Sequence, residues 1–201
     1  IKGYYQMWRN PAVSDTYEPG STFKLITSSA GIEEGVVKES DKFTCTGSLT
    51  IGGRRIKCWR HYRPHGEQTF AEGVQNSCNP VFMTVAERLG VAKMYDYIEA
   101  FGFMEKTGID LPYEAVGNVA CPEYKRKVFD EDWYLAETFD ASIGQGFTLA
   151  TPLQMALVMS EAANGGKKYR PYLVKDIIAL DGTVIKHFDP VVERDLNIDP
   201  S

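Results

Sequence analysis

The stretch Tyr17-Glu18-Pro19-Gly20-Ser21-Thr22-Phe23-Lys24 places two reactive side chains directly after a turn. The helical spacing of the apolar residues that follow predicts a helix over residues 21–34, so Ser21 and Lys24 lie one turn apart on one face. Free amides at the start of a helix favour an oxyanion near Ser21, and a lysine of lowered pKa can take the serine proton. In the simpler interpretation, Ser21 caps the helix and Lys24 is a solvated surface residue.

A second polar motif, Asn76-Ser77-Cys78-Asn79, falls in a predicted turn between two helices. In an extended or turn backbone, Ser77 and Asn79 project to one side while Cys78 points away. A hydroxyl and an amide that face the same cleft can relay a proton and hold a substrate amide. Alternatively, Asn79 is only the N-cap before Pro80, which suits the first helical position.

The third motif is Ser142-Ile143-Gly144-Gln145-Gly146, which precedes a helix predicted over residues 151–163. The glycines on both sides of Gln145 indicate a backbone that approaches other segments closely. The simpler interpretation is an ordinary entry from a loop into a helix.

The composition is that of an ordinary globular chain. Of the 201 residues, 43% are hydrophobic and 24% are charged, and the formal net charge is −5. Without a basic surplus to neutralise phosphates, the chain is not expected to be a nucleic-acid binder. No apolar run approaches the roughly 18 residues that a membrane helix needs.

Signals for helices and for strands are both present, which predicts an α/β (α+β) domain with helices dominating its middle. Apolar spacing, capping residues and turns predict helices over residues 69–76, 80–89 and 91–101, and hairpins over residues 48–58 and 172–188. Thr69 and Glu72 have the spacing of a capping box at the start of the helix predicted over residues 69–76. Residues 102–140 are interpreted as a mixed loop, rich in turns and aromatic residues.

Together, the order and separation of the three motifs resemble the transpeptidase domain of class B penicillin-binding proteins. Ser21 and Lys24 match the family motif S-x-x-K, and Ser77-Cys78-Asn79 matches S-x-N. Thr107-Gly108-Ile109-Asp110-Leu111-Pro112 and Gly144-Gln145-Gly146 are also similar to stretches of that family. The resemblance covers nearly the whole chain and is closest to the elongation and cell-shape branch. It implies the transpeptidase fold shared by penicillin-binding proteins and serine β-lactamases.

The resemblance implies a peptidoglycan D,D-transpeptidase that is acylated by the D-Ala-D-Ala end of a stem peptide and is inhibited covalently by β-lactams. Ser21 is then the expected nucleophile, and Lys24 is the base for acylation. Ser77 would link Lys24 to the leaving amine, while Asn79 would hold the substrate amide. The side chains of Ser21 and Lys24 are expected to lie within hydrogen-bond reach of each other and of Ser77. Gly144-Gln145-Gly146 would contribute to substrate binding. Catalysis of this kind requires no cofactor.

The resemblance also implies partners and a location. Stem peptides are the expected substrates, β-lactams the expected inhibitors and a membrane glycosyltransferase the expected protein partner. The expected location is the extracytoplasmic face of the bacterial cell membrane, with an anchor helix outside these residues.

One motif departs from the order of the family. The family has a K-T-G motif on a strand that follows Gly144-Gln145-Gly146, whereas Lys106-Thr107-Gly108 precedes it. We expect Lys106-Thr107-Gly108 to lie in a loop away from Ser21. Residues 1–201 are therefore expected to be a partial transpeptidase domain, mostly its helical middle, truncated after the N-terminal strands and before the K-T-G strand.

Cysteine and histidine residues around the predicted hairpin indicate a possible structural zinc site. If the hairpin pairs across its turn, Cys45 and Cys58 lie one diagonal step apart, and their sulfur atoms can meet. Two thiolates and His65 form the core of a closed zinc site, and Cys78 is the expected fourth ligand.

Several alternatives to this zinc site remain open. Asp41 or Glu67 could provide the fourth ligand instead of Cys78. Cys45 and Cys58 could form a disulfide, or both could be buried free thiols while His65 has a structural role.

Two other functions compete with the transpeptidase. A serine β-lactamase or a β-lactam sensor of the same superfamily would share the serine and lysine, and the rate of deacylation would distinguish it. A catalytically silent scaffold in a wall-synthesis complex is the non-enzymatic alternative, and the joint presence of Ser21, Lys24, Ser77 and Asn79 argues against it.

Overall fold

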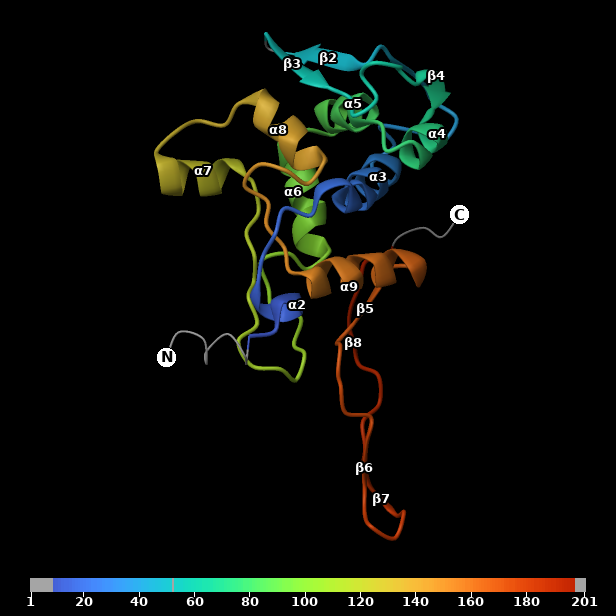
Figure 1. Ribbon diagram of the computed structural model, residues 1–201, viewed down its shortest axis with the longest axis vertical. Helices are drawn as coiled ribbons and strands as arrows, with labels where there is room; N and C mark the ends of the chain where they lie inside the picture. The colour runs from blue at the N-terminus through green and yellow to red at the C-terminus, as the bar shows by residue number, and fades with distance from the viewer. Residues whose placement is uncertain (1–8, 52, 198–201) are drawn as a thin grey trace.

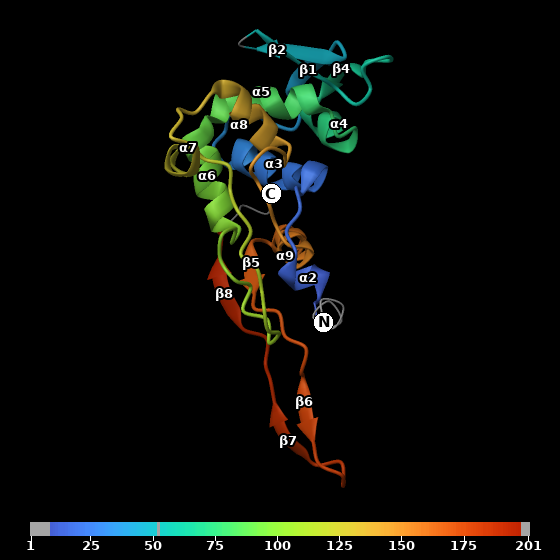
Figure 2. The same cartoon turned by 60° about the vertical axis from the view of Figure 1, so that its left-hand side comes forward.

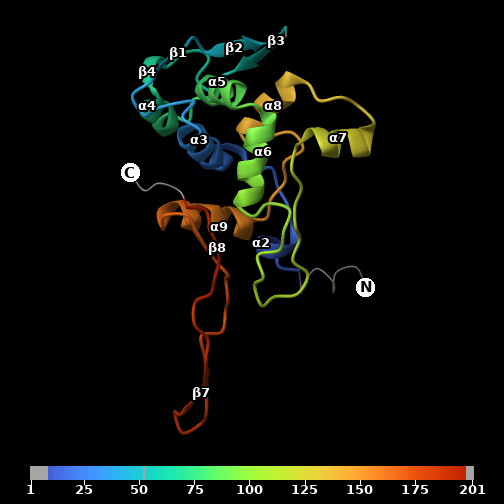
Figure 3. The same cartoon turned by 180° about the vertical axis from the view of Figure 1, so that it is seen from behind.

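The computed structural model describes residues 9–51 and 53–197, and its helices pack around α3 (Lys24–Glu33) (Figure 1). The helices in contact with α3 are α5 (Asn79–Leu89), α6 (Val91–Ala100) and α9 (Pro152–Ala163). The other helical segments are α2 (Pro11–Ser14), the 3-10 turn η1 (Gly20–Phe23), α4 (Phe70–Gln75), α7 (Pro122–Phe129) and α8 (Leu135–Ser142). From behind, α6 is seen to run from the level of α5 towards α9 (Figure 3).

The main core lies between these helices. Its members are apolar side chains of η1, α3, α5, α6, α9 and the segments that link them, among them Phe23, Ile26, Ala30, Ala86, Met94, Ile98, Phe103, Val119 and Val158. Burial of each large apolar side chain stabilises the fold by about 1.5–3 kcal/mol. The Phe23 ring packs edge-on against Phe103 at 5.5 Å between centroids. Because Phe23 lies between Ser21 and Lys24 in the sequence, this packing anchors the turn that carries them to the core.

Four two-stranded antiparallel sheets flank the helices in the described residues. The pairs are β1 (Lys42–Cys45) with β4 (Gly66–Thr69), β2 (Ser48–Ile51) with β3 (Arg54–Lys57), β5 (Lys167–Tyr169) with β8 (Val192–Asp195) and β6 (Asp176–Ile178) with β7 (Val184–His187). The first two pairs lie beside α5 at one end of the molecule, while the β6–β7 ribbon projects from the other end (Figures 1 and 2).

Several local predictions are confirmed. In the predicted hairpin, Ile51 pairs with Arg54, and the Cys58 amide donates to the Gly47 carbonyl at 2.9 Å. The capping box is present at the start of α4, where the Thr69 hydroxyl accepts from the Glu72 amide and the Glu72 carboxylate accepts from the Thr69 amide. Explicit caps and a tight turn therefore predicted these elements correctly.

The interpretation of residues 102–140 as a loop is wrong in its second half, where α7 and α8 form. The first of these helices begins with Pro122 after the N-cap Cys121 and ends at Phe129, and its C-cap residue Asp130 adopts a left-handed backbone conformation. The second has Tyr134 at its N-cap, and the Glu137 carboxylate accepts from the Tyr134 amide at 2.7 Å. Cysteine and tyrosine are weak N-cap signals, so the sequence pattern did not reveal either helix.

The segment Lys106-Thr107-Gly108 lies outside the helices and strands, as expected. Thr107 is buried, and its amide donates to the Glu114 carboxylate at 2.7 Å. A Cβ atom at Gly108 would lie 3.2 Å from Arg170, so this segment contacts the region that follows β5. In the two described stretches, no helix combines the length and the apolar character that crossing a membrane requires.

Candidate functional site

The candidate site begins at η1, where Ser21 and Lys24 have opposite environments. Ser21 is exposed in the 3-10 turn, whereas the Lys24 residue that begins α3 is only 4% exposed. The Thr22 hydroxyl donates to the Pro19 carbonyl at 2.7 Å and closes the turn. The serine hydroxyl is thus accessible from outside, while the lysine ammonium is held inside.

The Lys24 ammonium contacts the second motif. Its Nζ donates to the Ser77 carbonyl at 2.8 Å, to Ser77 Oγ at 2.9 Å and to Asn79 Oδ1 at 2.7 Å. It also lies 5.0 Å from the centroid of the Phe82 ring. Burial lowers the pKa of Lys24 from 10.5 to about 8. A lysine with this pKa can lose its proton close to neutral pH, as a general base must.

The turn at Ser77 explains why two side chains reach Lys24 and the third does not. Ser77 has a positive φ of 48°, which is uncommon for a residue other than glycine. Cys78 follows as the N-cap residue of α5, and Asn79 is the first residue of that helix. Ser77 and Asn79 accept from Lys24, while the Cys78 sulfur joins a separate cluster of cysteines, which confirms the predicted alternation.

One geometric expectation is wrong, because Ser21 does not bind Lys24. Among the described residues, no hydrogen bond joins the Ser21 hydroxyl to Lys24 or to Ser77. An ammonium has three N–H donors, and those of Lys24 are already directed to three acceptors. The arrangement therefore has the lysine charged and bound to the second motif, with the serine beside it.

The glycine motif packs directly against the turn that carries Ser21. The Gly20 amide donates to the Gly144 carbonyl at 2.9 Å. Gly144 has a φ of +70°, and a Cβ atom there would lie 2.6 Å from the Phe23 Cβ atom. The Gly146 amide donates to the Glu18 carboxylate at 3.0 Å. Gly144 thus permits a close approach that a side chain would prevent, which is the role expected of a glycine there.

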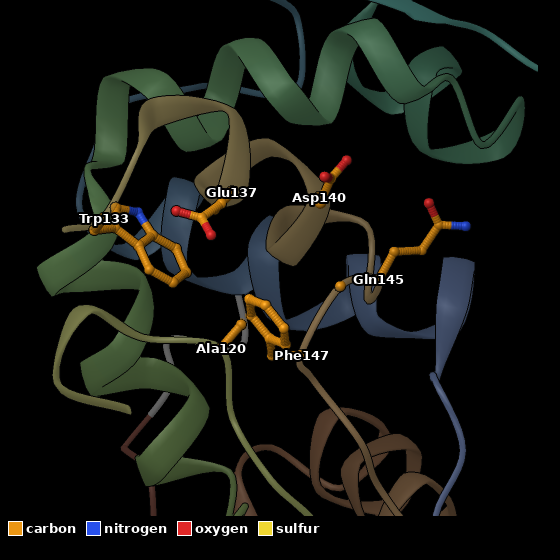
Figure 4. A pocket seen from close by; sticks show the side chains of 7 residues that line it. Ala120, Trp133, Glu137, Asp140, Gln145 and Phe147 are labelled. Carbon is orange, nitrogen blue, oxygen red and sulfur yellow. The ribbon is translucent and has the colours of Figure 1, made fainter. Parts of the chain in front are cut away.

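A cavity of about 220 Å³ adjoins this motif (Figure 4). It is lined by Ala120, Trp133, Glu137, Asp140, Gln145, Gly146 and Phe147. The Trp133 indole donates to the Thr138 hydroxyl at 2.8 Å, which fixes the ring in the wall of the cavity. Gln145 is exposed, and in Figure 4 its side chain points away from the Trp133 and Phe147 rings. The predicted substrate-binding residues Gln145 and Gly146 thus lie on the edge of a real cavity.

The four predicted metal ligands come together behind the second motif. One ligand atom from each of Cys45, Cys58, His65 and Cys78 lies within 4.8 Å of the others. The three cysteines are buried, and none of the four cysteines of the chain is in a disulfide. Neither Asp41 nor Glu67 belongs to this group, so the alternatives with a carboxylate ligand or a Cys45–Cys58 disulfide are not adopted.

The cluster is also electrostatically distinct. Burial, together with the positive charges of Arg60 and Lys24, lowers the pKa of His65, so its imidazole is neutral at neutral pH. The Nε2 atom of His65 is buried and has no hydrogen-bond partner among the described residues. Burial raises the pKa of Cys78 to about 12. A half-buried neutral imidazole and three buried cysteines can hold a soft divalent cation.

Three contacts of the site were not foreseen in the sequence. Phe82 lies under the Lys24 ammonium, Glu18 holds the Gly146 amide, and the Trp59 indole donates to the Asn76 carbonyl at 3.0 Å. Phe82 fits the apolar face of a helix, so its pattern indicates burial but not which cation it contacts. The other two contacts join segments that are distant in the sequence, and no local pattern predicts them.

Comparisons with known proteins agree with this arrangement. A family model described as the penicillin-binding protein transpeptidase domain matches residues 2–201. The chain is 41% identical over 188 residues to stage V sporulation protein D of Bacillus subtilis, an alignment that covers 92% of this chain and 28% of that protein. It is 33% identical over 168 residues to the peptidoglycan D,D-transpeptidase MrdA of Acinetobacter baumannii, covering 83% of this chain and 25% of that protein.

Solved structures are similar as well. The structure of Pseudomonas aeruginosa PBP2 in complex with WCK 5153 matches with a TM-score of 0.79 and 28% identity, over 98% of this chain and 47% of that one. The imipenem acyl-enzyme of penicillin-binding protein A from M. tuberculosis matches with a TM-score of 0.77 and 26% identity, over 96% of this chain and 45% of that one. The chain spans about a quarter of the length of the two curated relatives above.

Proposed function

Because the chain belongs to the penicillin-binding protein transpeptidase domain family, we propose that it carries the acylation site of a peptidoglycan D,D-transpeptidase. The observation that supports this most directly is the buried Lys24 ammonium, which binds Ser77 and Asn79 beside the exposed Ser21. A buried lysine of lowered pKa next to an accessible serine is the chemistry that a serine acyl-enzyme requires.

In the proposed acylation step, Ser21 Oγ attacks the carbonyl carbon of the D-Ala-D-Ala bond while neutral Lys24 takes its proton. The carbonyl oxygen becomes an oxyanion, and the Ser21 amide in the first turn of η1 is one donor to it. As the tetrahedral intermediate collapses, the carbon–nitrogen bond breaks. The proton on Lys24 passes through Ser77 Oγ to the departing D-Ala amine, which leaves the peptide as an ester on Ser21.

In the second half of the reaction, an amine of a neighbouring stem peptide attacks the ester carbonyl, and neutral Lys24 takes the proton that this amine loses. As the carbon–oxygen bond to Ser21 breaks, Lys24 returns that proton to Ser21 Oγ and the new amide is released. We assign Asn79 to hold the substrate amide, because its side chain accepts from the same Lys24 ammonium as Ser77 Oγ. We assign Gly144, Gln145 and Gly146 to the edge that guides the substrate towards the serine. No step uses a cofactor.

The test is acylation of the full-length protein with a labelled penicillin, followed by mass spectrometry of the peptide that contains Ser21. Label is expected on wild-type protein and not on a Ser21→Ala variant. Label that remains on the Ser21→Ala variant would show that another residue is the nucleophile. Turnover of a D-Ala-D-Ala donor with an added amine then distinguishes the transpeptidase from its competitors.

The same acylation experiment gives a different result for each of the competing functions. Rapid release of the penicilloyl group would favour a serine β-lactamase, and a long-lived acyl-enzyme without turnover of peptide donors would favour a sensor. Absence of acylation in wild-type protein would favour a silent scaffold. The β-lactams bound in solved relatives, such as the imipenem acyl-enzyme of M. tuberculosis penicillin-binding protein A, favour the acylating functions.

We also propose that Cys45, Cys58, His65 and Cys78 hold a structural zinc ion. The donor set of three thiolates and one imidazole is typical of closed, four-coordinate zinc sites. The Nδ1 atom of His65 lies 3.6 Å from the Cys58 sulfur, so the imidazole faces the cysteine cluster. The ion would deprotonate the thiols and join β1, the end of β3, the start of β4 and the N-terminus of α5.

The location and partners of the whole protein are proposed by analogy. We infer a site on the extracytoplasmic face of the cell membrane, stem peptides as substrates, β-lactams as inhibitors and a membrane glycosyltransferase as a partner. A solved complex of PBP2 with MreC from Helicobacter pylori shows that a related protein assembles with another protein.

A further inference from the structure

Residues Trp59–Pro64 form a loop, here called the basic loop, whose two ends are held together. The Cys58 sulfur lies 3.6 Å from His65 Nδ1, immediately outside the two ends. The loop rests on Gly47, where a Cβ atom would lie 2.8 Å from the His61 carbonyl oxygen. Gly47 has a φ of +91°, so both its conformation and its lack of a side chain suit this contact. The loop is therefore seated on the protein body at a defined place.

The same loop borders the candidate acylation site. The Trp59 indole donates to the carbonyl of Asn76, the residue directly before Ser77. Trp59 is nevertheless 61% exposed, and its ring packs edge-on against His65 at 5.5 Å. Trp59 thus connects the loop to the turn that positions Ser77 and leaves an aromatic face open at its border.

Residues 53–65, which include the basic loop, carry a positive net charge, whereas the net charge of the chain is negative. Residues 53–65 contain five of the 22 Lys and Arg residues and none of the 27 Asp and Glu residues, in a chain of net charge −5. Arg60 and Arg63 are exposed, and no ion pair within residues 9–51 and 53–197 involves either of them. Two guanidinium groups without acidic partners are therefore available to an external anion.

We propose that the basic loop binds a carboxylate of the acyl-donor peptide, on the part of the peptide that precedes the bond attacked by Ser21. A guanidinium recognises a carboxylate through paired N–H donors, which suits Arg60 and Arg63. The exposed rings of Trp59 and Tyr62 offer apolar surfaces for the peptide chain. This inference rests on the proposed function and adds a specificity determinant to it.

The experiment compares two synthetic D-Ala-D-thiolactate donors that differ only in carrying a side-chain carboxylate or its amide. Full-length wild-type protein, an Arg60→Gln/Arg63→Gln variant and a Lys127→Gln/Lys167→Gln control are assayed for thiol release. The control removes two exposed positive charges from α7 and β5, so it changes the net charge equally.

For the carboxylate donor, the arginine variant is expected to show a KM raised about tenfold with little change in kcat, because a charged contact is lost. The amide donor, the control variant and penicillin acylation are expected to be unaffected. Equal effects on both donors, or no effect on either, would overturn the proposal. If wild-type protein failed to acylate at all, the proposed function itself would be wrong.

An anionic membrane surface is the other source of negative charge that the loop could meet. Binding to vesicles that contain phosphatidylglycerol is therefore measured for the same three proteins. Loss of vesicle binding in the arginine variant, with unchanged donor kinetics, would assign the loop to the membrane and overturn its role in donor recognition. Unchanged metal content and melting temperature in the arginine variant would show that the nearby cysteine cluster is intact.

Discussion

Lys24 Nζ donates to Asn79 Oδ1 at 2.7 Å, so that one ammonium joins the first residue of α3 to the first residue of α5. The same ammonium binds Ser77 through two oxygen atoms. Burial lowers the pKa of Lys24, and the nearby Cys78 and Cys58 thiols oppose this shift but do not cancel it. With a pKa of about 8, Lys24 changes from mostly charged to mostly neutral over a small rise in pH above neutrality.

The first prediction concerns the pH dependence of acylation. Because burial lowers the pKa of Lys24 to about 8, the neutral amine is the minor form at pH 6 and the major form at pH 9. The second-order rate constant for penicillin acylation should therefore rise about tenfold per pH unit below pH 8 and level off above it. Stopped-flow measurements between pH 6 and 10 test this, with the stability of the drug measured in parallel.

A lysine variant sharpens this test. Lys24→Arg keeps the positive charge but cannot act as a base, so acylation should fall by about 10²–10⁴ and lose its rise with pH. A Lys24→Arg protein with the wild-type profile would show that another group takes the proton.

The second prediction concerns the glycine that lies against the serine turn. Gly144→Ala would place a Cβ atom 2.6 Å from the Phe23 Cβ atom and 2.8 Å from the Gly20 nitrogen. We expect the displaced turn to slow acylation at least about tenfold, since small misplacements of reacting groups are costly. Gly165→Ala is the matched control, because Gly165 has a similar φ of +79° but no atom within 4 Å of the added Cβ. Equal acylation by the two variants would contradict this role for Gly144.

These two predictions also show how far the sequence was informative. The Lys24–Ser77 contact was foreseen because motif order, interpreted through a family resemblance, brings two distant segments together. The absence of a hydrogen bond between Ser21 and Lys24 was not foreseen. It arises because the Lys24 ammonium already donates to three other oxygen atoms, and the sequence does not show how many acceptors surround it. For Gly144, the sequence predicted that its backbone packs closely against another segment, but it did not identify Gly20 as the partner.

Fold prediction succeeded where the signal is local. Thr69 and Glu72 form the predicted capping box because both groups lie within one turn. The pairing of β1 with β4 was missed, because each strand has only four residues and the β2–β3 hairpin separates them in the sequence. An alternation of apolar and polar residues over four positions is too short to identify a strand. The start of α8 was missed because Tyr134 is a weak capping residue whose helix is stabilised by packing on α5.

The third prediction concerns metal content. Full-length protein purified without chelators should contain about one zinc ion per chain, and Cys45→Ser or Cys58→Ser should lose it and melt at least about 5 °C lower. Cys121→Ser is the control, because Cys121 is buried but lies outside the cluster. Elemental analysis and thermal unfolding provide the measurements. Metal-free protein with a mass smaller by two hydrogens would indicate a disulfide in place of the metal site.

The fourth prediction concerns a buried carboxyl group in α9. Glu161 is fully buried, and neither of its carboxyl oxygens has a hydrogen-bond partner in the described part of the chain. Burial raises the pKa of Glu161 from 4.5 to about 7, although the charges of Lys168 and Arg194 oppose this shift. The folded chain therefore holds a proton that the unfolded chain loses between pH 4.5 and 7. Its free energy of unfolding should fall by up to about 3 kcal/mol as pH rises through that window.

Glu161→Gln tests this, because the amide has a similar shape and does not ionise. The variant should lose this part of the pH dependence and should melt higher than wild-type protein at pH 8. Glu39→Gln, at an exposed position, should leave the pH dependence unchanged. Parallel stability curves for wild-type protein and Glu161→Gln would show that Glu161 does not titrate in this range.

The contact between Gly20 and Gly144 has a consequence for biosynthesis. The serine turn is synthesised before the glycine motif that supports it, because that motif follows α8. Until then the Phe23 side chain has the Phe103 ring available but not Gly144, and the turn lacks the Gly144 carbonyl that accepts from the Gly20 amide. A nascent chain that stalls before α8 should thus expose apolar surface to chaperones and should be unable to react with penicillin. Reactivity with the drug would therefore report how far translation and folding have progressed.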